Sequence, residues 1–521
     1  MTSKIKTEVL IVGAGPTGLS LACQFIRYGV SFVIIDKKEG ITPYSKALGV
    51  HARTLEIYEQ LDLAERAVAE GVVAGKARIL EGGEIRGEVD LSSVGRGLSA
   101  YPYMLVLEQS KNERLLYDYI AAHGADVRWQ TELTELAQHD SRVIATIKTA
   151  AGAAETVEAE YLVGADGAKS PVRKMLGLKF EGSTFARMFY VADARVDWKF
   201  DHDALHVFLA RHSVVAFFPM AGDDRYRIVG AFPDEFAKQE GEVLYEEIEA
   251  RIKEEAEIEL DLHDVSWFST YKVHTRHVEN FRRGRCFLAG DSAHVHTPAG
   301  GQGMNTGIQD AYNLAWKLAF VLKGRAAARI LESYNSERLE NAENLLKTTD
   351  RMFNFLAGED WLVNLVRLHL FPRLAGRALS IEAVRVEFFK RLSQIGINYR
   401  RHALSRHTGD ADFAVQAGDR LPYFSVDGAS VFDRLRAPKF HLLVLTDGAR
   451  DYRPLKNDLE TSFAEVVDFH DIPLYPPVAE IFGAEKSLMI LLRPDNYVAL
   501  IASEITLQNV QSYFREVLGT D

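Results

Sequence analysis

Short apolar runs and amphipathic stretches alternate along the first part of the chain. Residues 8–12 and 31–35 are apolar runs rich in β-branched side chains, and residues 16–28, between them, repeat apolar positions at helical spacing. Continuous apolar runs of this length are typical of parallel strands that are buried on both faces. The pattern therefore predicts a strand, a helix and a second strand that belong to one parallel sheet.

The middle of the chain is expected to form a different kind of sheet. Between residues 181 and 270 several stretches alternate apolar and polar positions, which is the period of a half-buried antiparallel strand. These stretches are 189–196, 205–209, 214–218 and 225–232. Beyond them, the periodicity predicts an acidic, solvated helix at 244–256, an amphipathic helix at 308–322 and helical structure from 342 to 399 with a break at Pro372.

A glycine turn at residues 13–18 lies between the first predicted strand and the first helix. Gly13 allows a tight turn, Gly15 lets the backbone approach a phosphate, and Gly18 lets the helix pack closely on the sheet. Asp36 ends the second strand, where an acid hydrogen-bonds the hydroxyls of an adenosine ribose and would repel a 2′-phosphate. This unit predicts a dinucleotide site but leaves FAD and NAD as alternatives.

Composition narrows the class of partner. The 521 residues carry a formal net charge of −12, and affinity for nucleic acid comes mainly from Lys and Arg, so no nucleic-acid partner is expected. The only cysteines, Cys23 and Cys286, lie in apolar runs and are interpreted as buried small hydrophobes. Because neither a disulfide framework nor an apolar run of membrane-spanning length is present, we expect a cytoplasmic protein without a membrane partner.

Two further motifs repeat the strand-to-turn pattern. One apolar strand runs into Gly164-Ala165-Asp166-Gly167, and another runs into Gly290-Asp291. A strand that ends in Gly-Asp places a carboxylate at the carboxyl edge of the sheet, where ligands of doubly wound folds bind. A glycine-rich turn at 300–305 then precedes the helix at 308–322, whose N-terminus can stabilise an anion. A simple NAD dehydrogenase has no use for this third motif.

Together the three motifs resemble those of the single-component, class A flavoprotein monooxygenases of the p-hydroxybenzoate hydroxylase type, in the branch of phenol hydroxylases and aromatic polyketide hydroxylases. The resemblance implies an α/β fold with a Rossmann-like FAD-binding domain, an inserted antiparallel-sheet substrate domain and a C-terminal thioredoxin-like α/β domain. The implied boundaries are 1–180 and 270–345 for the FAD-binding domain, with strands near 74–107 contributing to the substrate sheet, 181–269 for the substrate domain, 346–410 for a helical linker and 411–521 for the thioredoxin-like domain. The last domain has no cysteine, so thiol–disulfide chemistry is excluded, and a packing, capping or oligomer-forming role, including a homodimer, is left open.

The resemblance also implies roles for single residues. Asp36 takes the adenosine ribose, Asp166 serves both FAD and the nicotinamide donor, and Asp291 binds the ribityl chain. Pro298 lies against the flavin where oxygen reacts. The other cofactor-binding candidates are Gly13, Ala14, Gly15, Pro16, Thr17, Gly18, Lys37, Arg53, Gln109, Leu133, Gly290, Gly301, Gly303, Met304 and Asn305.

In the implied reaction, NADH or NADPH reduces FAD, the reduced flavin adds O2, and the resulting C4a-hydroperoxide transfers one oxygen atom to an electron-rich phenolic or polyketide-like ring. Such an intermediate requires a roofed, apolar cavity that excludes water. Candidates for the cavity wall, each equally explained as ordinary core, are Tyr190, Phe208, Phe217 and Pro219, with His206 and His51 as candidate bases and Phe353, Leu356, Val363, Val366 and Leu370 as candidates for closing one side. Leu48 stands where phenol hydroxylases have an acidic residue and Lys46 where an arginine is usual, so the substrate itself is left open.

Other hypotheses compete with this interpretation. A Baeyer–Villiger or epoxidising oxygenase of the same fold stays open, as does a non-catalytic FAD protein that holds a labile ligand. A flavin-dependent halogenase is disfavoured because all five tryptophans are isolated in the sequence. His294 and His296 have the spacing of a metal site, but no paired carboxylate or cysteine cluster accompanies them, so no metal is expected. Arg276, just ahead of the third motif, is interpreted as a packing residue.

Overall fold

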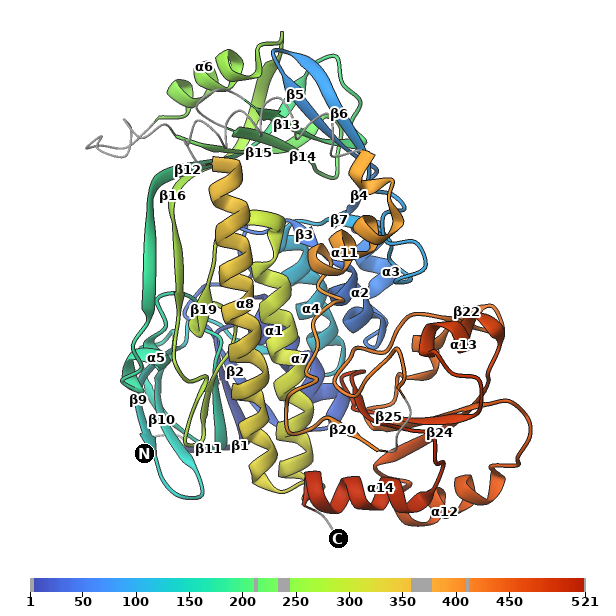
Figure 1. The fold of residues 1–521 in the computed structure, drawn as a ribbon. Helices are drawn as coiled ribbons and strands as arrows, with labels where there is room; N and C mark the ends of the chain where they lie inside the picture. Colours follow the sequence, from blue (N-terminus) through green and yellow to red (C-terminus); the bar gives the residue numbers. More distant parts are fainter. Residues whose placement is uncertain (1–3, 210–213, 233–243, 358–376, 409–411, 520–521) are drawn as a thin grey trace.

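The computed structural model describes residues 4–209, 214–232, 244–357, 377–408 and 412–519. Three layers of structure follow one another in space: a substrate sheet capped by one helix, a central unit of parallel strands and long helices, and a C-terminal α/β unit (Figure 1). The architecture agrees with the predicted arrangement of a Rossmann-like domain, an inserted antiparallel sheet and a C-terminal α/β domain.

The central sheet contains the predicted strand–helix–strand unit. Its strands are β1 (Lys4–Val12), β2 (Phe32–Ile35), β8 (Val127–Arg128), β9 (Glu132–Gln138), β10 (Val143–Lys148), β11 (Ala154–Gly164), β17 (Arg282–Arg283) and β18 (Cys286–Leu288). The order is β17-β18-β11-β1-β2-β8, and β1, β2, β11 and β18 pair in parallel. Val9, Leu10 and Ile11 have no exposed surface, which explains the continuous apolar run of β1.

The central unit also contains helices. They are α1 (Pro16–Tyr28), α2 (Ala52–Glu59), α3 (Ala64–Glu70), α4 (Gln109–Ala122), α5 (Pro171–Met175), α7 (Gly303–Leu322) and α8 (Glu332–Ala357). Of these, α1 and α5 pack directly on this sheet. Pro16 begins α1, where its missing N–H costs no hydrogen bond, and Gly29 ends the helix in the left-handed conformation at φ 62°. The helix α7 packs against both α1 and α8, so it joins the N-terminal helix to the second late helix.

The substrate sheet has eight strands in the order β19-β16-β12-β15-β14-β13-β5-β6. They are β5 (Lys76–Glu81), β6 (Glu84–Asp90), β12 (Glu181–Asp197), β13 (Ala204–Leu209), β14 (Val214–Pro219), β15 (Arg225–Ala231), β16 (Asp261–His277) and β19 (His294–Val295). The helix α6 (Tyr245–Ala256) covers the side away from the FAD-binding domain (Figure 1). Strands β3 (Gly49–Val50), β4 (Val72–Ala74) and β7 (Met104–Val106) form a small separate sheet, so β5 and β6 alone connect the 74–107 region to the large one.

The C-terminal unit is a mixed sheet in the order β20-β26-β25-β23-β24, flanked by helices. Its elements are β20 (Arg406–His407), β21 (Ser425–Val426), β22 (Ala429–Ser430), β23 (Phe440–Thr446), α12 (Arg453–Phe463), β24 (Val467–Pro473), α13 (Pro476–Phe482), β25 (Leu488–Leu492), β26 (Val498–Ala502) and α14 (Leu507–Tyr513), preceded by α11 (Glu382–Leu392). Alternate side chains of β23 belong to two different clusters: Leu442 packs with the central unit, and Leu443 packs in the unit's own core. The sheet is therefore buried on both faces.

Both cysteines are buried and free, as the sequence indicated. Among the described residues, no helix combines the length and apolar character needed to cross a membrane. The side chains of the candidate pocket-closing residues lie outside the described part of the chain; they are Phe353, Leu356, Val363, Val366 and Leu370.

Candidate active site

The structure brings the three glycine motifs together at one edge of the parallel sheet. Their strands β1, β11 and β18 are parallel neighbours, so the turns that follow them leave the sheet at the same edge. A Cβ atom placed on Gly13 would lie 2.3 Å from the carbonyl oxygen of Ala165, so the first turn touches the second. A Cβ atom on Gly290 would lie 2.5 Å from Oγ1 of Thr17, so the third turn touches the first.

The first turn is open where a phosphate would approach. A Cβ atom on Gly15 would meet no atom of the described chain within 4 Å, whereas one on Gly18 would lie 1.9 Å from the carbonyl oxygen of Gly13. In the described residues, no side chain caps the amides at the start of α1. Free amides and the positive end of a helix bind anions, so this turn has the open space and the donors that a pyrophosphate requires.

Asp36 is fixed beside this turn. Its carboxylate accepts hydrogen bonds from the amide of Ala14 at 2.7 Å and the amide of Lys38 at 2.8 Å. The amide of Thr131 donates to the carbonyl oxygen of Asp36, which brings the segment leading to the buried Leu133 alongside. Lys37 is exposed. The acid therefore stands where the adenosine end of a dinucleotide would lie.

The second motif presents a carboxylate with an unused oxygen. Oδ2 of Asp166 accepts a hydrogen bond from the amide of Val172 at 3.0 Å, and Oδ1 is buried without a partner in the described residues. Burial raises the pKa of this carboxyl. Arg173, in the same segment, donates to the carbonyl oxygens of Ser292 and Ala168 at 2.9 and 2.7 Å, so it ties the second motif to the third. A buried, orphaned oxygen of this kind fits a polar group of a bound cofactor.

The third motif is supported from below by a buried ion pair that the sequence reasoning missed. Asp310, on α7, accepts from the amide of Gly290 at 2.9 Å and lies 2.7 Å from Nε2 of His294. Nε of Arg338, on α8, donates to the other oxygen of Asp310 at 2.6 Å, and both side chains are fully buried. Burial alone would raise the pKa of Asp310, but Arg338 and His294 lower it. The sequence held one signal for this ion pair, because Asp310 is a lone acid on the apolar face of the helix predicted at 308–322.

Asp291 itself faces outward from this support. Its side chain is exposed at the turn, yet the surrounding protein removes much of its hydration and raises the pKa of its carboxyl, while His294 and the Lys46 ammonium act in the opposite direction. Nε2 of His294 is engaged by Asp310, so this nitrogen is not free to bind a metal.

The loop ahead of α7 is held by one buried side chain. Oδ1 of Asn305 accepts from the amide of His51, and its Nδ2 donates to the carbonyl oxygens of Gly49 and Gly301, all at 2.9 Å. Nε2 of His51 lies 2.9 Å from the carbonyl oxygen of Gly300, and burial lowers the pKa of this imidazole to about 4. The loop is thus anchored on its protein side. The neighbouring Pro298 is exposed, while Gly303 and Met304 begin α7.

Two of the candidate cofactor residues have protein partners in the structure. Oε1 of Gln109 accepts from the amides of Lys46 and Ala47, both at 3.2 Å, so this side chain shapes the loop that carries Lys46. Arg53 is 1% exposed, donates to the carbonyl oxygen of Asp495 at 2.7 Å and pairs with Glu56. Its Nη1 and Nη2 are thus engaged at the boundary with the C-terminal unit, whereas Nε is buried without a partner among the described residues, so the FAD contact expected of Arg53 stays a prediction.

The candidate substrate residues lie on the α6 side of the substrate sheet. They share a buried cluster with Ile248 and Ile252 of α6; the members named from the sequence are Tyr190, Phe208 and Phe217. His206 has no exposed surface and packs against Trp198 and Phe200, and burial lowers its pKa to about 4. The strand alternation puts Pro219 on the same side. Alternate residues of a strand point to opposite faces of the sheet. Because these residues point to the α6 side, they form core under α6 and do not face the FAD-binding domain.

The opposite face of this sheet meets the FAD-binding domain. Asp193 and Arg227 form a bidentate ion pair with both N–O distances at 2.7 Å, and their side chains are 8% and 3% exposed. The guanidinium lies 5.0 Å from the ring centre of Trp267, which stacks at 6.1 Å on Tyr44 of the FAD-binding domain. Nη1 of Arg227 is buried without a partner among the described residues. A charged donor is thus available on the side where a substrate would meet the cofactor.

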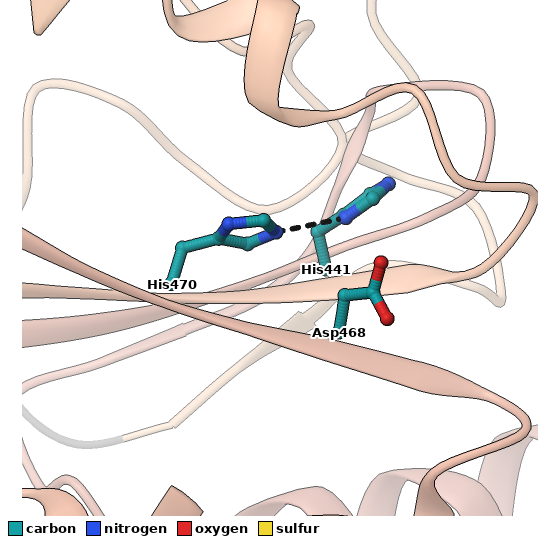
Figure 2. Close-up of side chains that lie close together, drawn as sticks. All are labelled: His441, Asp468 and His470. Atoms are coloured by element: carbon teal, nitrogen blue, oxygen red, sulfur yellow. Dashed lines mark hydrogen bonds between the residues drawn. The ribbon is translucent and has the colours of Figure 1, made fainter.

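Three residues of the C-terminal unit lie close enough together to suggest a metal site (Figure 2). His441, Asp468 and His470 offer ligand atoms within 4.8 Å of one another. Nδ1 of His441 lies 3.0 Å from Nε2 of His470, and Nε2 of His441 lies 3.2 Å from the carbonyl oxygen of Ala437. Lys439 pairs with Asp468 at 3.3 Å. Since protein groups account for all three side chains, we assign no ion to this cluster.

Comparison with known proteins identifies the family. Residues 6–349 match the model of the FAD binding domain family. The chain is 36% identical over 523 residues to 12-dehydrotetracycline 5-monooxygenase/anhydrotetracycline 6-monooxygenase of Streptomyces rimosus, covering 96% of both chains. It is 30% identical over 525 residues to pentachlorophenol 4-monooxygenase of Sphingobium chlorophenolicum, covering 94% of this chain and 93% of that one. The solved structure of OxyS anhydrotetracycline hydroxylase from Streptomyces rimosus is 30% identical, superimposes with a TM-score of 0.76 and covers 99% of this chain and 100% of that one.

These matches confirm the predicted fold, the FAD cofactor and the class of reaction. The relatives named above are monooxygenases or hydroxylases, which agrees with hydroxylation and not with the other oxygenase reactions or the ligand-holding alternative. The chain belongs to the FAD-binding domain family, and within it to the FAD-dependent aromatic monooxygenases.

Proposed function

We propose that this monooxygenase hydroxylates a phenolic ring, either alone or within a polycyclic aromatic compound, and that Arg227 binds the phenolic oxygen. The observation that carries the proposal is the buried Asp193–Arg227 pair with its unpartnered Nη1 on the face that meets the FAD-binding domain. A guanidinium that keeps one free donor binds an anionic oxygen well, because charge-assisted hydrogen bonds are stronger than neutral ones.

The residues at the sheet edge would hold FAD along its length. The open first turn and Asp36 would bind the pyrophosphate and the adenosine ribose, Asp291 would bind the ribityl chain, and the loop that leads from Pro298 to Asn305 would meet the flavin ring. When bound, FAD takes electrons from NADH or NADPH and supplies the oxygen atom that is transferred from O2. The amides at the start of α7 would stabilise negative charge on the reduced ring.

The substrate would lie between this loop and the flavin-facing side of the substrate sheet. Trp267 and Tyr44 offer aromatic faces on which a planar ring can stack, and Leu48 packs with Phe218 at the other side. Leu48 cannot take a proton, so a phenol is not deprotonated at this position. We propose that Arg227 instead favours the phenolate, because a nearby positive charge lowers the pKa of the bound phenol.

The first experiment asks which compounds are oxygenated. The purified holoenzyme is incubated with NADH or NADPH and a panel of phenols, anilines and polycyclic phenols, and the products are examined by mass spectrometry. We expect products heavier by one oxygen atom from phenolic members. Oxidation of the nicotinamide with release of hydrogen peroxide only, for every compound tested, would contradict the proposal.

The second experiment tests the role of Arg227 with a matched variant. Arg78 is also a buried arginine of the substrate sheet, but it lies on the α6 side and pairs with Glu88 at 2.9 Å. We expect Arg227→Met to raise KM for a phenolic substrate about tenfold or more, the size expected for losing one charged hydrogen bond, with FAD content unchanged. Arg78→Met should lower stability and leave KM unchanged. Equal KM values for both variants and the parent would refute the assignment.

A further inference from the structure

The C-terminal unit has no assigned role, although its sheet inserts a charged loop into the FAD-binding domain. We infer that this unit is a positioning element of the FAD site: through Arg493, Tyr399 and Arg338 it holds Asp310 and, through Asp310, the amide of Gly290. The inference rests on FAD binding at the Gly290–Asp291 turn. It concerns how that turn is held, and it is independent of which substrate is oxygenated.

The loop between β25 and β26 carries the first part of the chain of contacts. Arg493 has no exposed surface and donates to both oxygens of Glu337 on α8, at 2.7 and 3.0 Å. It also donates to Asp495 of its own loop at 2.9 Å. Lys317 completes the group with a 2.8 Å contact to Glu337. Two cations and two anions are thus enclosed together, and each needs the others because an unpaired buried charge is costly.

Tyr399 connects this group to Arg338. The Arg493 guanidinium lies 5.2 Å from the ring centre of Tyr399, whose ring packs against that of Tyr497 at 4.4 Å. The hydroxyl oxygen of Tyr399 accepts a hydrogen bond from Nη1 of Arg338 at 2.9 Å. Burial raises the pKa of this phenol well above its ordinary value, so it stays neutral. Tyr399 lies between α11 and β20, in the segment that leads into the C-terminal unit, and Arg493 and Tyr497 of that unit hold its ring. Through Tyr399 the C-terminal unit therefore fixes the orientation of an arginine on α8.

Arg338 in turn contacts both loops that would surround FAD. Its Nε donates to Asp310, which accepts from the amide of Gly290, and its Nη2 donates to the carbonyl oxygen of Thr306 at 3.2 Å. One guanidinium thus joins the Gly-Asp turn to the first turn of α7. The guanidinium of Arg338 is planar and its donors are fixed relative to one another. A rotation of this side chain would therefore move both loops relative to each other.

A second contact of the same loop points in the same direction. The carbonyl oxygen of Asp495 accepts from Arg53 on α2 at 2.7 Å, and the Asp495 carboxylate accepts from Nε1 of Trp316 on α7 at 3.1 Å. The loop therefore touches both helices that begin beside the glycine-rich loop. This arrangement explains why a thioredoxin-like unit without cysteine is kept against the FAD-binding domain.

The test removes one hydroxyl from the chain of contacts. Tyr399→Phe deletes the acceptor of Arg338 and leaves the ring packing intact. Tyr513→Phe is the matched control, because Tyr513 is equally buried in the C-terminal unit and its hydroxyl donates to the carbonyl oxygen of Leu404 at 2.9 Å, away from Arg338. Each apoprotein is titrated with FAD, oxidised and reduced, and its Tm is measured without ligand.

We expect both variants to lower Tm by a few degrees, as the loss of one buried hydrogen bond does. Only Tyr399→Phe should weaken FAD binding, by about fivefold or more, and change the ratio of the two dissociation constants. Equal FAD affinities in Tyr399→Phe and Tyr513→Phe would overturn the inference. Both readouts need no substrate, so a failure to hydroxylate any compound would count against the proposed function and not against this one.

A double-mutant cycle provides the second measurement. If Tyr399 acts through Asp310, the effects of Tyr399→Phe and Asp310→Asn on FAD affinity should be far from additive, because both changes disturb the same arginine. Additive effects would show that Tyr399 acts by another route, and the inference would be wrong.

Discussion

The edge of the parallel sheet and the facing side of the substrate sheet are built from different parts of the chain. At the edge, glycines and main-chain amides form the surface, and atoms added at Gly13 or Gly18 would collide with backbone. On the substrate sheet, side chains such as Arg227 and Trp267 form the surface, above a core that packs under α6. We conclude that the cofactor site tolerates little change in shape, whereas the substrate side can change specificity without disturbing the cofactor.

The largest effect is expected where the backbone leaves no room. In Gly18→Ala, the new Cβ atom would lie 1.9 Å from the carbonyl oxygen of Gly13, so α1 cannot stay in place. FAD affinity should fall by roughly 1000-fold or more, equivalent to about 4 kcal/mol. The measurements are an FAD titration and the Tm of the apoprotein. In Gly15→Ala the added atom meets nothing in the chain, so the apoprotein Tm should be unchanged. Normal FAD binding by Gly18→Ala would break the comparison.

Substitutions at two neighbouring residues can distinguish the roles of the two faces of the substrate sheet. Phe217 is fully buried on the α6 side, and Phe218 points to the other side beside Leu48. Phe217→Ala should lower the free energy of unfolding by about 3 kcal/mol or more, the cost of a large cavity, and leave KM for the aromatic substrate unchanged. Phe218→Ala should change KM with a smaller loss of stability. Urea denaturation and steady-state kinetics measure both. A change of KM in Phe217→Ala alone would show that the faces are assigned the wrong way round.

Low pH should destabilise the core of the substrate sheet by protonating His206. Burial, with help from Arg78, lowers the pKa of this imidazole to about 4, below its ordinary value of 6.5. Between pH 6.5 and 4, the folded protein therefore binds fewer protons than the unfolded chain. The contribution of the neutral His206 to the free energy of unfolding is complete above pH 6.5 and is lost as the pH falls towards 4. The loss is about 3 kcal/mol. His206→Phe should show a shallower decrease in unfolding free energy between pH 7 and 4, and parallel curves would contradict the explanation.

The smallest effect is expected from a surface charge at the cofactor edge. The Lys46 ammonium lowers the pKa of Asp291, so Lys46→Met should favour protonation of this carboxylate. FAD affinity at neutral pH should fall two- to fivefold, the usual size for an exposed charge pair, and less at high salt. The exposed Lys148, on β10, provides the control as Lys148→Met. A loss larger than tenfold would mean that a side chain, and not backbone, dominates at this edge.

Local signals made most of the fold and the turns predictable. Gly13, Gly15, Gly18 and Asp36 lie in one strand–turn–helix–strand unit, so their relative positions follow from the geometry of that unit. Asp310 and Arg338 were missed because they lie on different helices and meet only when α7 and α8 pack together. For Tyr190 and Phe217, the alternation predicted half-buried strands, but it could not tell which face of the sheet α6 would cover, and both side chains lie under α6. Arg53 lies near a family motif in sequence, yet Glu56 and Asp495 determine its place.

The order of strands in the parallel sheet has a consequence for how the chain folds during its synthesis on the ribosome. β1 pairs with β11, and β11 pairs with β18, which begins at Cys286. At about 5–20 residues per second, synthesis needs roughly 15–55 s after β1 to deliver β18. Until β11 (Ala154–Gly164) is made, the apolar first strand lacks one of its two neighbours, and until β18 is made, the cofactor site lacks its third turn. FAD supply during translation, and chaperones that shield β1, are therefore expected to decide how much nascent chain matures.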